Sequence, residues 1–347
     1  MLAMLLLAVG APLGLLDRDT PEWTWIPAIL LIDVAHVYST CFRVYFDPTE
    51  LARRRWLYIL VPVGSYAIAW AVYSESPTWF WRVLAYIAVF HFVRQQYGWV
   101  AMYRSRAGDF SRVGWWIDAT AVYLATIYPL IYWHAHLPRQ FWWFVESDFA
   151  AIPSLLAVCL APVYWLSMAL YATRSLYRGL KLGKWNPGKD LVVATTALCW
   201  YVGIITFNSD YAFTVTNVII HGIPYMVLVF WFFRRRRTTE GSKATVWQHL
   251  FVFLGTVWFL AYAEELVWDQ SLWQERPWLF GPSWGWQAGA NWMVPLLAVP
   301  QLTHYILDGF IWRRRQNPEL TSELKLTAGE PNASADLTES SSSGIAH

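Results

Sequence analysis

The sequence predicts an all-α, polytopic transmembrane helix bundle of about ten spans, with both termini in the cytoplasm. Of its 347 residues, 56% are apolar and only 14% are charged, whereas soluble domains carry about 25% charged residues. Ten apolar runs approach the roughly 20 residues that a membrane-spanning helix needs. The net charge of +2 is too small, and the basic clusters too short, to indicate a nucleic-acid partner.

The ten predicted spans account for residues 1–312, which we expect to form one transmembrane domain. The first lacks a basic n-region and a clear cleavage site, so we expect a retained span rather than a signal peptide. Residues 313–347, rich in Ser, Glu and Thr, are expected to form a disordered cytoplasmic tail. The spans are 1–16, 23–43, 56–73, 79–103, 114–133, 153–173, 190–208, 211–233, 246–266 and 290–312.

The orientation follows from the basic residues, which collect in the connections after even-numbered spans. Twenty of the 26 Lys and Arg lie in these connections, and four lie in the opposite ones. Cytoplasmic loops carry such an excess of Lys and Arg. An even number of spans then places both termini in the cytoplasm.

The opposite, outer connections are aromatic and acidic. Glu264–Gln287 forms the longest of them, and its tryptophans indicate a segment in the headgroup region, as expected in a chain with 25 Trp. We expect Glu264 and Glu265 to be solvated at a span end, and His134 and His136 to form an exposed interfacial pair. The tryptophans are Trp268, Trp273, Trp278, Trp284, Trp286 and, just beyond, Trp292.

The three cysteines lie inside apolar runs and show no paired spacing. We interpret them as small buried hydrophobic residues, without a disulfide framework or a thiolate metal site. They are Cys41, Cys159 and Cys199.

Four histidines lie inside predicted spans, and all four spans are even-numbered and therefore parallel. His36, His91, His221 and His304 stand about 10 to 13 residues from the outer ends of their spans. At 1.5 Å per residue, these positions correspond to depths of roughly 15–20 Å in a hydrocarbon core of about 30 Å. Because ionisable residues are costly at this depth, four imidazoles in one slab predict a common metal or proton site.

Each of these histidines has a polar residue one helical turn away, on the same face. Carboxylates so placed can fix an imidazole tautomer, ligate a metal or relay protons. The amides are also ordinary helix-bridging groups, and the arginine is as well suited to neutralising a carboxylate as to contacting a substrate. The companions are Asp33 (for His36), Arg94 and Gln95 (for His91), Asn217 (for His221) and Asp308 (for His304).

The last span resembles the final helix of the bacterial β-carotene-cleaving dioxygenases of the Brp/Blh type. The segment 302–313 (LTHYILDGFIWR) carries a His, an Asp, an aromatic-aliphatic run and an Arg in that family's order. Val89–Phe92 and Ile219–His221 are similar to two further histidine segments, and His36 takes the place of the first. Tyr225 stands where the family has a second His. The resemblance implies a membrane-embedded non-haem iron centre that activates dioxygen against a long apolar substrate.

The leading hypothesis is an integral-membrane metal oxygenase or hydroxylase acting on a lipid-like or isoprenoid substrate, with dioxygen as co-substrate. The four histidines would bind the metal, and Asp33 and Asp308 would serve as the catalytic acids. Iron is the expected metal, and imidazole and carboxylate ligands also suit other divalent transition metals. The predicted location is a bacterial inner membrane. A bis-His haem b electron carrier and a proton-coupled transporter remain as alternatives.

Overall fold

All regular elements of the described part of the chain are helices. The computed structural model describes residues 2–16, 20–283, 289–313 and 315–324. The expectations for Trp284 and Trp286 therefore lie outside the described residues. The α-helices are α1 (Leu2–Gly10), α2 (Ala35–Arg43), α3 (Pro48–Arg53), α4 (Arg55–Glu75), α5 (Pro77–Arg106), α6 (Arg112–Ala135), α7 (Ser154–Leu182), α8 (Pro187–Trp200), α9 (Asp210–Thr239), α10 (Val246–Trp268), α11 (Pro277–Phe280), α12 (Ala290–Leu297), α13 (Val299–Ile311) and α14 (Glu319–Glu323).

Four shorter helical elements join or extend these helices. A 3-10 turn and a π-helix lead into α2 without a break, and π-helices also continue α8 and α10. A π-helix inside or beside an α-helix shifts the register of the side chains that follow, and such segments occur frequently at functional sites. They are η1 (Glu22–Thr24), η2 (Ile26–Val34), η3 (Tyr201–Thr206) and η4 (Asp269–Trp273).

Six helices are long and apolar enough to cross a membrane, which supports the predicted membrane protein. Their outer faces carry exposed apolar side chains, such as Leu166 on α7 and Phe251 on α10, as expected for contact with lipid. The six are Glu22–Arg43, Arg55–Glu75, Ser154–Leu182, Pro187–Thr206, Asp210–Thr239 and Val246–Trp273.

The other four predicted spans also form helices, but they are not among these six. The nine residues of α1 rise only about 14 Å, less than half of a hydrocarbon core. Helix α5 is 30 residues long but carries Arg82 and Arg94. The last predicted span is divided into α12 and α13 at Ala298. The number of ten spans and their orientation stay predictions.

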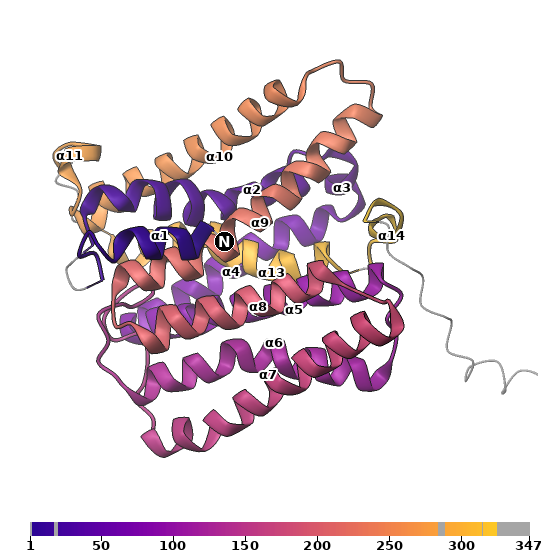
Figure 1. The fold of residues 1–347 in the computed structure, drawn as a ribbon. Coiled ribbons are helices and arrows are strands. Elements are labelled where there is room, and N and C mark those ends of the chain that lie inside the picture. The colour runs from indigo at the N-terminus through magenta and orange to yellow at the C-terminus, as the bar shows by residue number, and fades with distance from the viewer. Residues whose placement is uncertain (1, 17–19, 284–288, 314, 325–347) are drawn as a thin grey trace, which may run out of the picture.

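The helices that carry His36, His91, His221 and His304 run in the same direction across the bundle. Figure 1 shows α2, α5, α9 and α13 running from the left-hand end to the right-hand end. The connections after α2, α5, α7 and α9, which hold the basic clusters, all lie at the right-hand end. The alternation of charge in the sequence therefore corresponds to two chemically different ends of one bundle.

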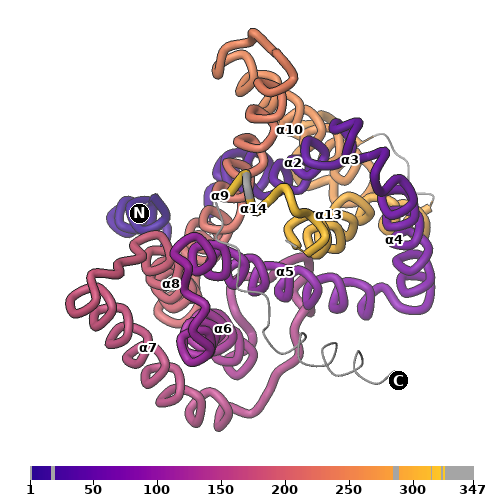
Figure 2. The backbone as a smooth tube through the Cα atoms, turned by 90° about the vertical axis from the view of Figure 1, so that its right-hand side faces the viewer, coloured from indigo at the N-terminus to yellow at the C-terminus, as the bar shows by residue number. Residues whose placement is uncertain are grey.

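Helix α13 lies beside α2, α4 and α5, with α9 on the far side of α2, as the end-on view shows (Figure 2). Gly222 permits the close approach of α9 to η2, because a Cβ at this position would lie 2.7 Å from Cγ2 of Ile32. Buried Leu30, Tyr225 and Val229 pack in the same cluster between these elements. This packing brings the middle of α9 against the start of α2, where two of the histidines lie.

The first part of the expected disordered tail is folded, which corrects that expectation for residues 315–324. This segment contains α14, and its Asn317 is fully buried. Arg53 donates a hydrogen bond of 2.6 Å to Oδ1 of Asn317, and Glu319 pairs with Arg53 and Arg43. The polar composition that suggested disorder is explained here by pairing with the basic residues around α3. Residues 325–347 lie outside the described residues.

Candidate metal centre

The four histidines converge on one point inside the bundle, as the sequence predicts. His36 is carried by α2, His91 by α5, His221 by α9 and His304 by α13. Their exposed fractions are 2%, 6%, 0% and 1%, so all four rings are withdrawn from the surface. One ring nitrogen from each residue lies within 4.8 Å of the other three.

The closest contacts join Nε2 atoms in two pairs. Nε2 of His221 lies 3.0 Å from Nε2 of His36, and Nε2 of His304 lies 3.2 Å from Nε2 of His91. Between neighbouring rings, the centroids are 4.6 Å apart within each pair and 5.0 Å apart between His36 and His304 and between His91 and His221. The rings thus form a closed quadrilateral with their Nε2 atoms directed inward.

These distances fit a single transition-metal ion. With metal–nitrogen bonds of about 2.1 Å, ligands at right angles lie about 3.0 Å apart and opposite ligands about 4.2 Å apart. The close pairs at 3.0 and 3.2 Å match the first value. The largest separation of 4.8 Å requires a contraction of only about 0.3 Å per ring. Without a metal, each close pair can share one proton in an N–H···N hydrogen bond.

Aromatic side chains hold two of the rings in place. Phe92 stacks on His221, with centroids 3.5 Å apart and planes inclined by 9°. Tyr305 stacks on His91 at 4.7 Å and 29°. Because Phe92 follows His91 and Tyr305 follows His304 in the sequence, each packing residue is positioned by a helix that also supplies a histidine. This arrangement limits ring rotation and keeps water away from the ring faces.

A hydrogen-bonded chain from Asp308 to His304 sets the tautomer of that imidazole. The Tyr225 hydroxyl donates to Oδ1 of Asp308 at 2.5 Å. Oγ1 of Thr40 lies 2.9 Å from the Tyr225 hydroxyl and 2.8 Å from Nδ1 of His304. An ionised Asp308 only accepts, which commits the Tyr225 proton to it; in that state Thr40 donates to Tyr225 and accepts from His304.

With Asp308 ionised, the Nδ1 atom of His304 carries the proton, and its Nε2 presents a lone pair toward the other three rings. Metal-binding histidines are commonly oriented by such an acceptor on the second ring nitrogen. Trp312 also donates to Oδ1 of Asp308, at 3.3 Å. The carboxylate oxygens lie 3.9 Å from Nε2 of His91 and from Nδ1 of His304. Asp308 thus acts through Tyr225 and Thr40 in this geometry, and its contacts to the imidazoles are longer than a hydrogen bond.

Asp33 lies close to the cluster but does not bond to it. Its Oδ1 is 3.7 Å from Nδ1 of His36, and its side chain is 30% exposed. The reason is local: Asp33 lies in the π-helix η2, whereas His36 lies in α2. The i to i+3 pairing assumed from the sequence applies to an α-helix, and the wider π-helical turn changes the relative direction of the two side chains.

A cavity of about 590 Å³ lies beside Asp33, and none of the four histidines is among its lining residues. Its walls include Val37 from α2 and Glu264 and Glu265 from α10, together with the indole rings of several tryptophans. Glu264 and Glu265 are partly buried, which corrects the expectation that they are simply solvated. The aromatic wall residues include Trp25, Trp81, Trp143, Trp268 and Trp273.

The three remaining polar companions do not contact the imidazoles. Arg94 is exposed, donates to the hydroxyl of Tyr123 on α6 and lies over the ring of Tyr97, so it neutralises neither predicted carboxylate. Gln95 has both amide atoms buried without a partner among the described residues. Asn217 donates to the carbonyl of Phe213 at 3.1 Å, within its own helix.

One polar atom of Asn217 nevertheless makes no hydrogen bond among the described residues. Its Oδ1 and the Nδ1 of His221, one turn later on α9, are both buried without a hydrogen-bond partner among the described residues. Residues four apart on a helix are neighbours on one face. Asn217 is thus on the face of α9 that carries His221.

The other histidines and the cysteines lie elsewhere. His134 is buried, not exposed as expected. Its Nε2 lies 3.0 Å from the Tyr86 hydroxyl, and its Nδ1 lies 2.6 Å from the Leu130 carbonyl oxygen. His136 is exposed. Of the three cysteines predicted to be buried, Cys199 is buried, Cys41 is half-buried and Cys159 is exposed on α7.

Two important residues, Thr40 and Tyr225, were not among the predicted site residues. Thr40 follows His36 by four positions and Tyr225 follows His221 by four, so both obey the same-face rule that selected Asp308. Attention to hydroxyl side chains at this spacing would have found them. No known protein family, curated protein or solved structure matches the chain.

Proposed function

We propose that the four histidines bind one transition-metal ion and that the protein is a membrane-embedded, non-haem metal oxygenase or hydroxylase. The observation that carries the metal site is the convergence of four buried imidazole nitrogens within 4.8 Å. No sulfur ligand belongs to this group. A donor set of neutral imidazoles suits iron, copper or zinc, and iron is the metal that fits the proposed chemistry.

Oxygenase chemistry is supported by the number and the surroundings of the ligands. Four protein ligands leave positions vacant on a metal that accepts six, and a bound iron would supply dioxygen activation at such a position. The residues of this chain would exclude water: Phe92 and Tyr305 cover two ring faces, and all four histidines are buried. A dry site protects reactive chemistry from competing reactions with water.

The proposed roles of the acidic residues differ from each other. Asp308 would hold or release a proton at its Oδ1, and the Tyr225 and Thr40 hydroxyls would transmit that change to Nδ1 of His304. Asp33 would act at the boundary between the cluster and the cavity, because it lines the cavity and lies 3.7 Å from His36. Of these two residues, Asp33 alone lines the cavity that would hold a substrate.

The proposed substrate is a hydrophobic, membrane-soluble molecule of lipid-like or isoprenoid character. The indole walls of the 590 Å³ cavity suit an apolar or conjugated body. The carboxylates among them, such as Glu264, suit a polar end group on that substrate. The resemblance of the segment 302–313 to the carotene-cleaving family supports the same substrate class.

A haem carrier fits the spacing less well. Axial histidines must lie on opposite faces of a macrocycle, whereas Nε2 atoms here approach to 3.0 and 3.2 Å in both pairs. No porphyrin plane fits between rings in direct contact.

The test is elemental analysis of the purified full-length protein and of the His304→Ala variant. We expect about one transition-metal ion per chain in the wild type and little in the variant, without a Soret absorption band. His249→Ala is the matched control, because His249 is also buried in a long helix but belongs to α10, outside the cluster. Equal metal content in all three proteins would contradict the site. If the wild-type protein binds metal but shows no substrate-dependent oxygen uptake, the metal-site proposal stands and the oxygenase proposal is rejected.

A further inference from the structure

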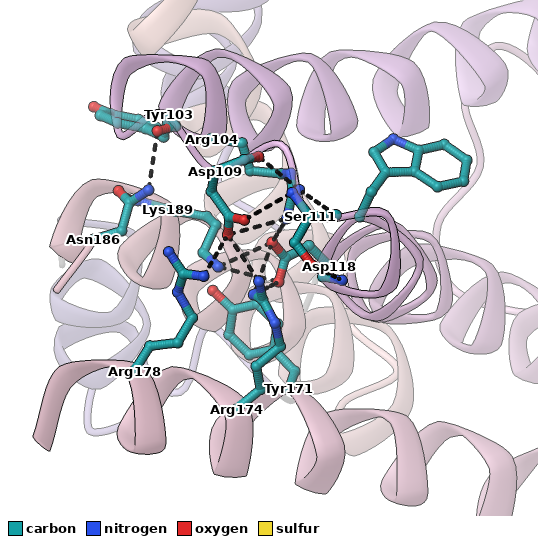
Figure 3. A network of polar contacts seen from close by, with 12 residues as sticks. Tyr103, Arg104, Asp109, Ser111, Asp118, Tyr171, Arg174, Arg178, Asn186 and Lys189 are labelled. Atoms are coloured by element: carbon teal, nitrogen blue, oxygen red, sulfur yellow. Dashed lines mark hydrogen bonds and ion pairs between the residues drawn. The ribbon is translucent and has the colours of Figure 1, made fainter. Parts of the chain in front are cut away.

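A second polar cluster lies at the end of the bundle where the basic connections meet, where α5, α6, α7 and α8 come together (Figure 3). Its centre is Asp118 on α6, which is completely buried. Lys189 contacts both oxygens of Asp118 at 3.1 and 3.0 Å, and Arg174 contacts them at 3.2 and 3.4 Å. Arg104 completes the shell with a further ion pair. Three cations thus surround one carboxylate.

A second carboxylate, Asp109 in the α5–α6 connection, shares two of these cations. Arg174 donates to its Oδ2 at 2.8 Å, and Arg104 and Arg178 pair with it at 3.4 and 3.5 Å. Burial alone would raise the pKa of the Asp109 carboxyl, but the three guanidinium groups hold this pKa below its usual value. Asp109 is therefore ionised at neutral pH.

The cluster carries more positive than negative charge even with every carboxylate ionised. Five cations face three carboxylates, which leaves two positive charges in excess. Asp190 also accepts a hydrogen bond from the Tyr171 hydroxyl through its Oδ1. The excess lies on Arg178, whose side chain is 22% exposed, and on the exposed Lys184, so it faces the surface, where it can attract an anion. The cations are Arg104, Arg174, Arg178, Lys184 and Lys189, and the anions are Asp109, Asp118 and Asp190.

A cavity of about 270 Å³ opens beside the cluster. It is lined by Arg178, Lys184 and Lys189, with Asn186 and Asp109 also in the wall. Arg178 makes one contact of 3.5 Å in the cluster, and the Lys184 side chain is exposed. At about 30 Å³ per water-sized group, the cavity holds roughly nine such groups.

The backbone around this cavity adds to the attraction for an anion. Helix α8 begins at Pro187, and its N-cap Asn186 accepts from the Lys189 amide at 3.3 Å. Asn186 also donates to the Tyr103 carbonyl at 2.9 Å, which fastens the start of α8 to α5. The positive end of the helix dipole is thereby fixed beside the three basic side chains.

We propose that this cavity binds a phosphate group, either of an anionic phospholipid at the membrane surface or free in solution. Arg178 and Lys184 are the recognising side chains, and Lys189 and the start of α8 complete the site. Basic pockets between membrane helices recognise lipid headgroups by this chemistry. The exposed Trp185 on the cavity wall is suited to the interface where a headgroup lies. The site lies apart from the histidine cluster and does not depend on its metal.

The test is thermal unfolding of the full-length protein in a neutral detergent. One titration adds phosphatidylglycerol, a second adds inorganic phosphate, and phosphatidylcholine serves as the neutral lipid. Any ligand that binds only the folded state raises Tm in a saturable way. The double variant Arg178→Gln with Lys184→Gln removes the recognising charges, and Lys184→Gln alone, at an exposed position, keeps the Arg178–Asp109 ion pair and should also weaken binding. Arg234→Gln with Lys243→Gln is the matched control, with the same charge change at exposed positions near the same end.

We expect a saturable rise of Tm, at least tenfold weaker apparent affinity in the double variant, and unchanged affinity in the control. A response to phosphatidylglycerol alone would assign a lipid headgroup, and a response to inorganic phosphate would assign a free anion. No saturable response in the wild type would overturn the proposal. Equal loss in the double variant and the control would do the same, since it would show a general charge effect.

Discussion

The substitution Thr40→Val tests whether the hydrogen-bonded chain from Asp308 prepares His304 to bind a metal. Thr40 Oγ1 lies 2.8 Å from Nδ1 of His304, from which it accepts when Asp308 is ionised, and that histidine is 1% exposed. Valine keeps the shape of threonine but removes the acceptor. A buried donor left without a partner costs about 1–3 kcal/mol. The ring can avoid this cost by moving its proton to Nε2, which blocks the metal-binding lone pair.

The expected loss of metal affinity follows from this competition. Residues that orient a metal-binding histidine typically contribute about 10- to 100-fold in affinity, which corresponds to about 1.4–2.7 kcal/mol. This loss of about 1.4–2.7 kcal/mol in binding free energy lies within the cost of about 1–3 kcal/mol for leaving the Nδ1–H donor unpaired, so the two estimates agree. We therefore expect Thr40→Val to bind a divalent metal about 10- to 100-fold more weakly than the wild type.

The assay is equilibrium dialysis of purified protein against zinc at buffered free concentrations, followed by elemental analysis. Zinc is redox-silent, so affinity is measured without oxidative damage. Thr40→Ser, which keeps the hydroxyl, is the control and should retain affinity close to that of the wild type. Wild-type affinity in a folded Thr40→Val protein would refute the reasoning. So would an equal loss in both variants.

Three further outcomes are expected. His221→Ala should abolish metal binding while His249→Ala retains it, as measured by elemental analysis. Because the pKa of Asp109 is lowered on folding, its stabilisation is present above about pH 4, the unfolded value. Tm should therefore fall as the pH drops below that value, and Asp109→Asn should flatten this dependence. Trp133→Ala, which empties a fully buried site, should cost about 3–5 kcal/mol and lower Tm, whereas Trp247→Ala, at a position 75% exposed, should change it little.

The helical architecture and the convergence of the histidines could be predicted because both depend on regular geometry. A fixed rise per residue turns sequence position into depth. His36 and His304 therefore reach the same level on parallel helices, and the structure brings their rings to 5.0 Å. The basic clusters at alternate connections likewise lie at one end of the bundle, because successive helices run in opposite directions.

The hydrogen-bonding partners of the histidines required the tertiary structure. Asp33 misses its hydrogen bond because a π-helix separates its register from that of His36, and no sequence pattern signalled that change. Arg94 turns outward to Tyr123, because the rotation of α5 about its axis is set by packing against α4, α6 and α8.

Which side chains share a depth in the bundle could thus be inferred from the sequence, since that depth depends only on backbone repeat and chain direction. Which of them meet depends on how the helices pack. Thr40 and Tyr225 join Asp308 to His304 only because α2, α9 and α13 pack with particular rotations. Helix rotation depends on interdigitating side chains from several segments, and those contacts are not encoded in any one of them.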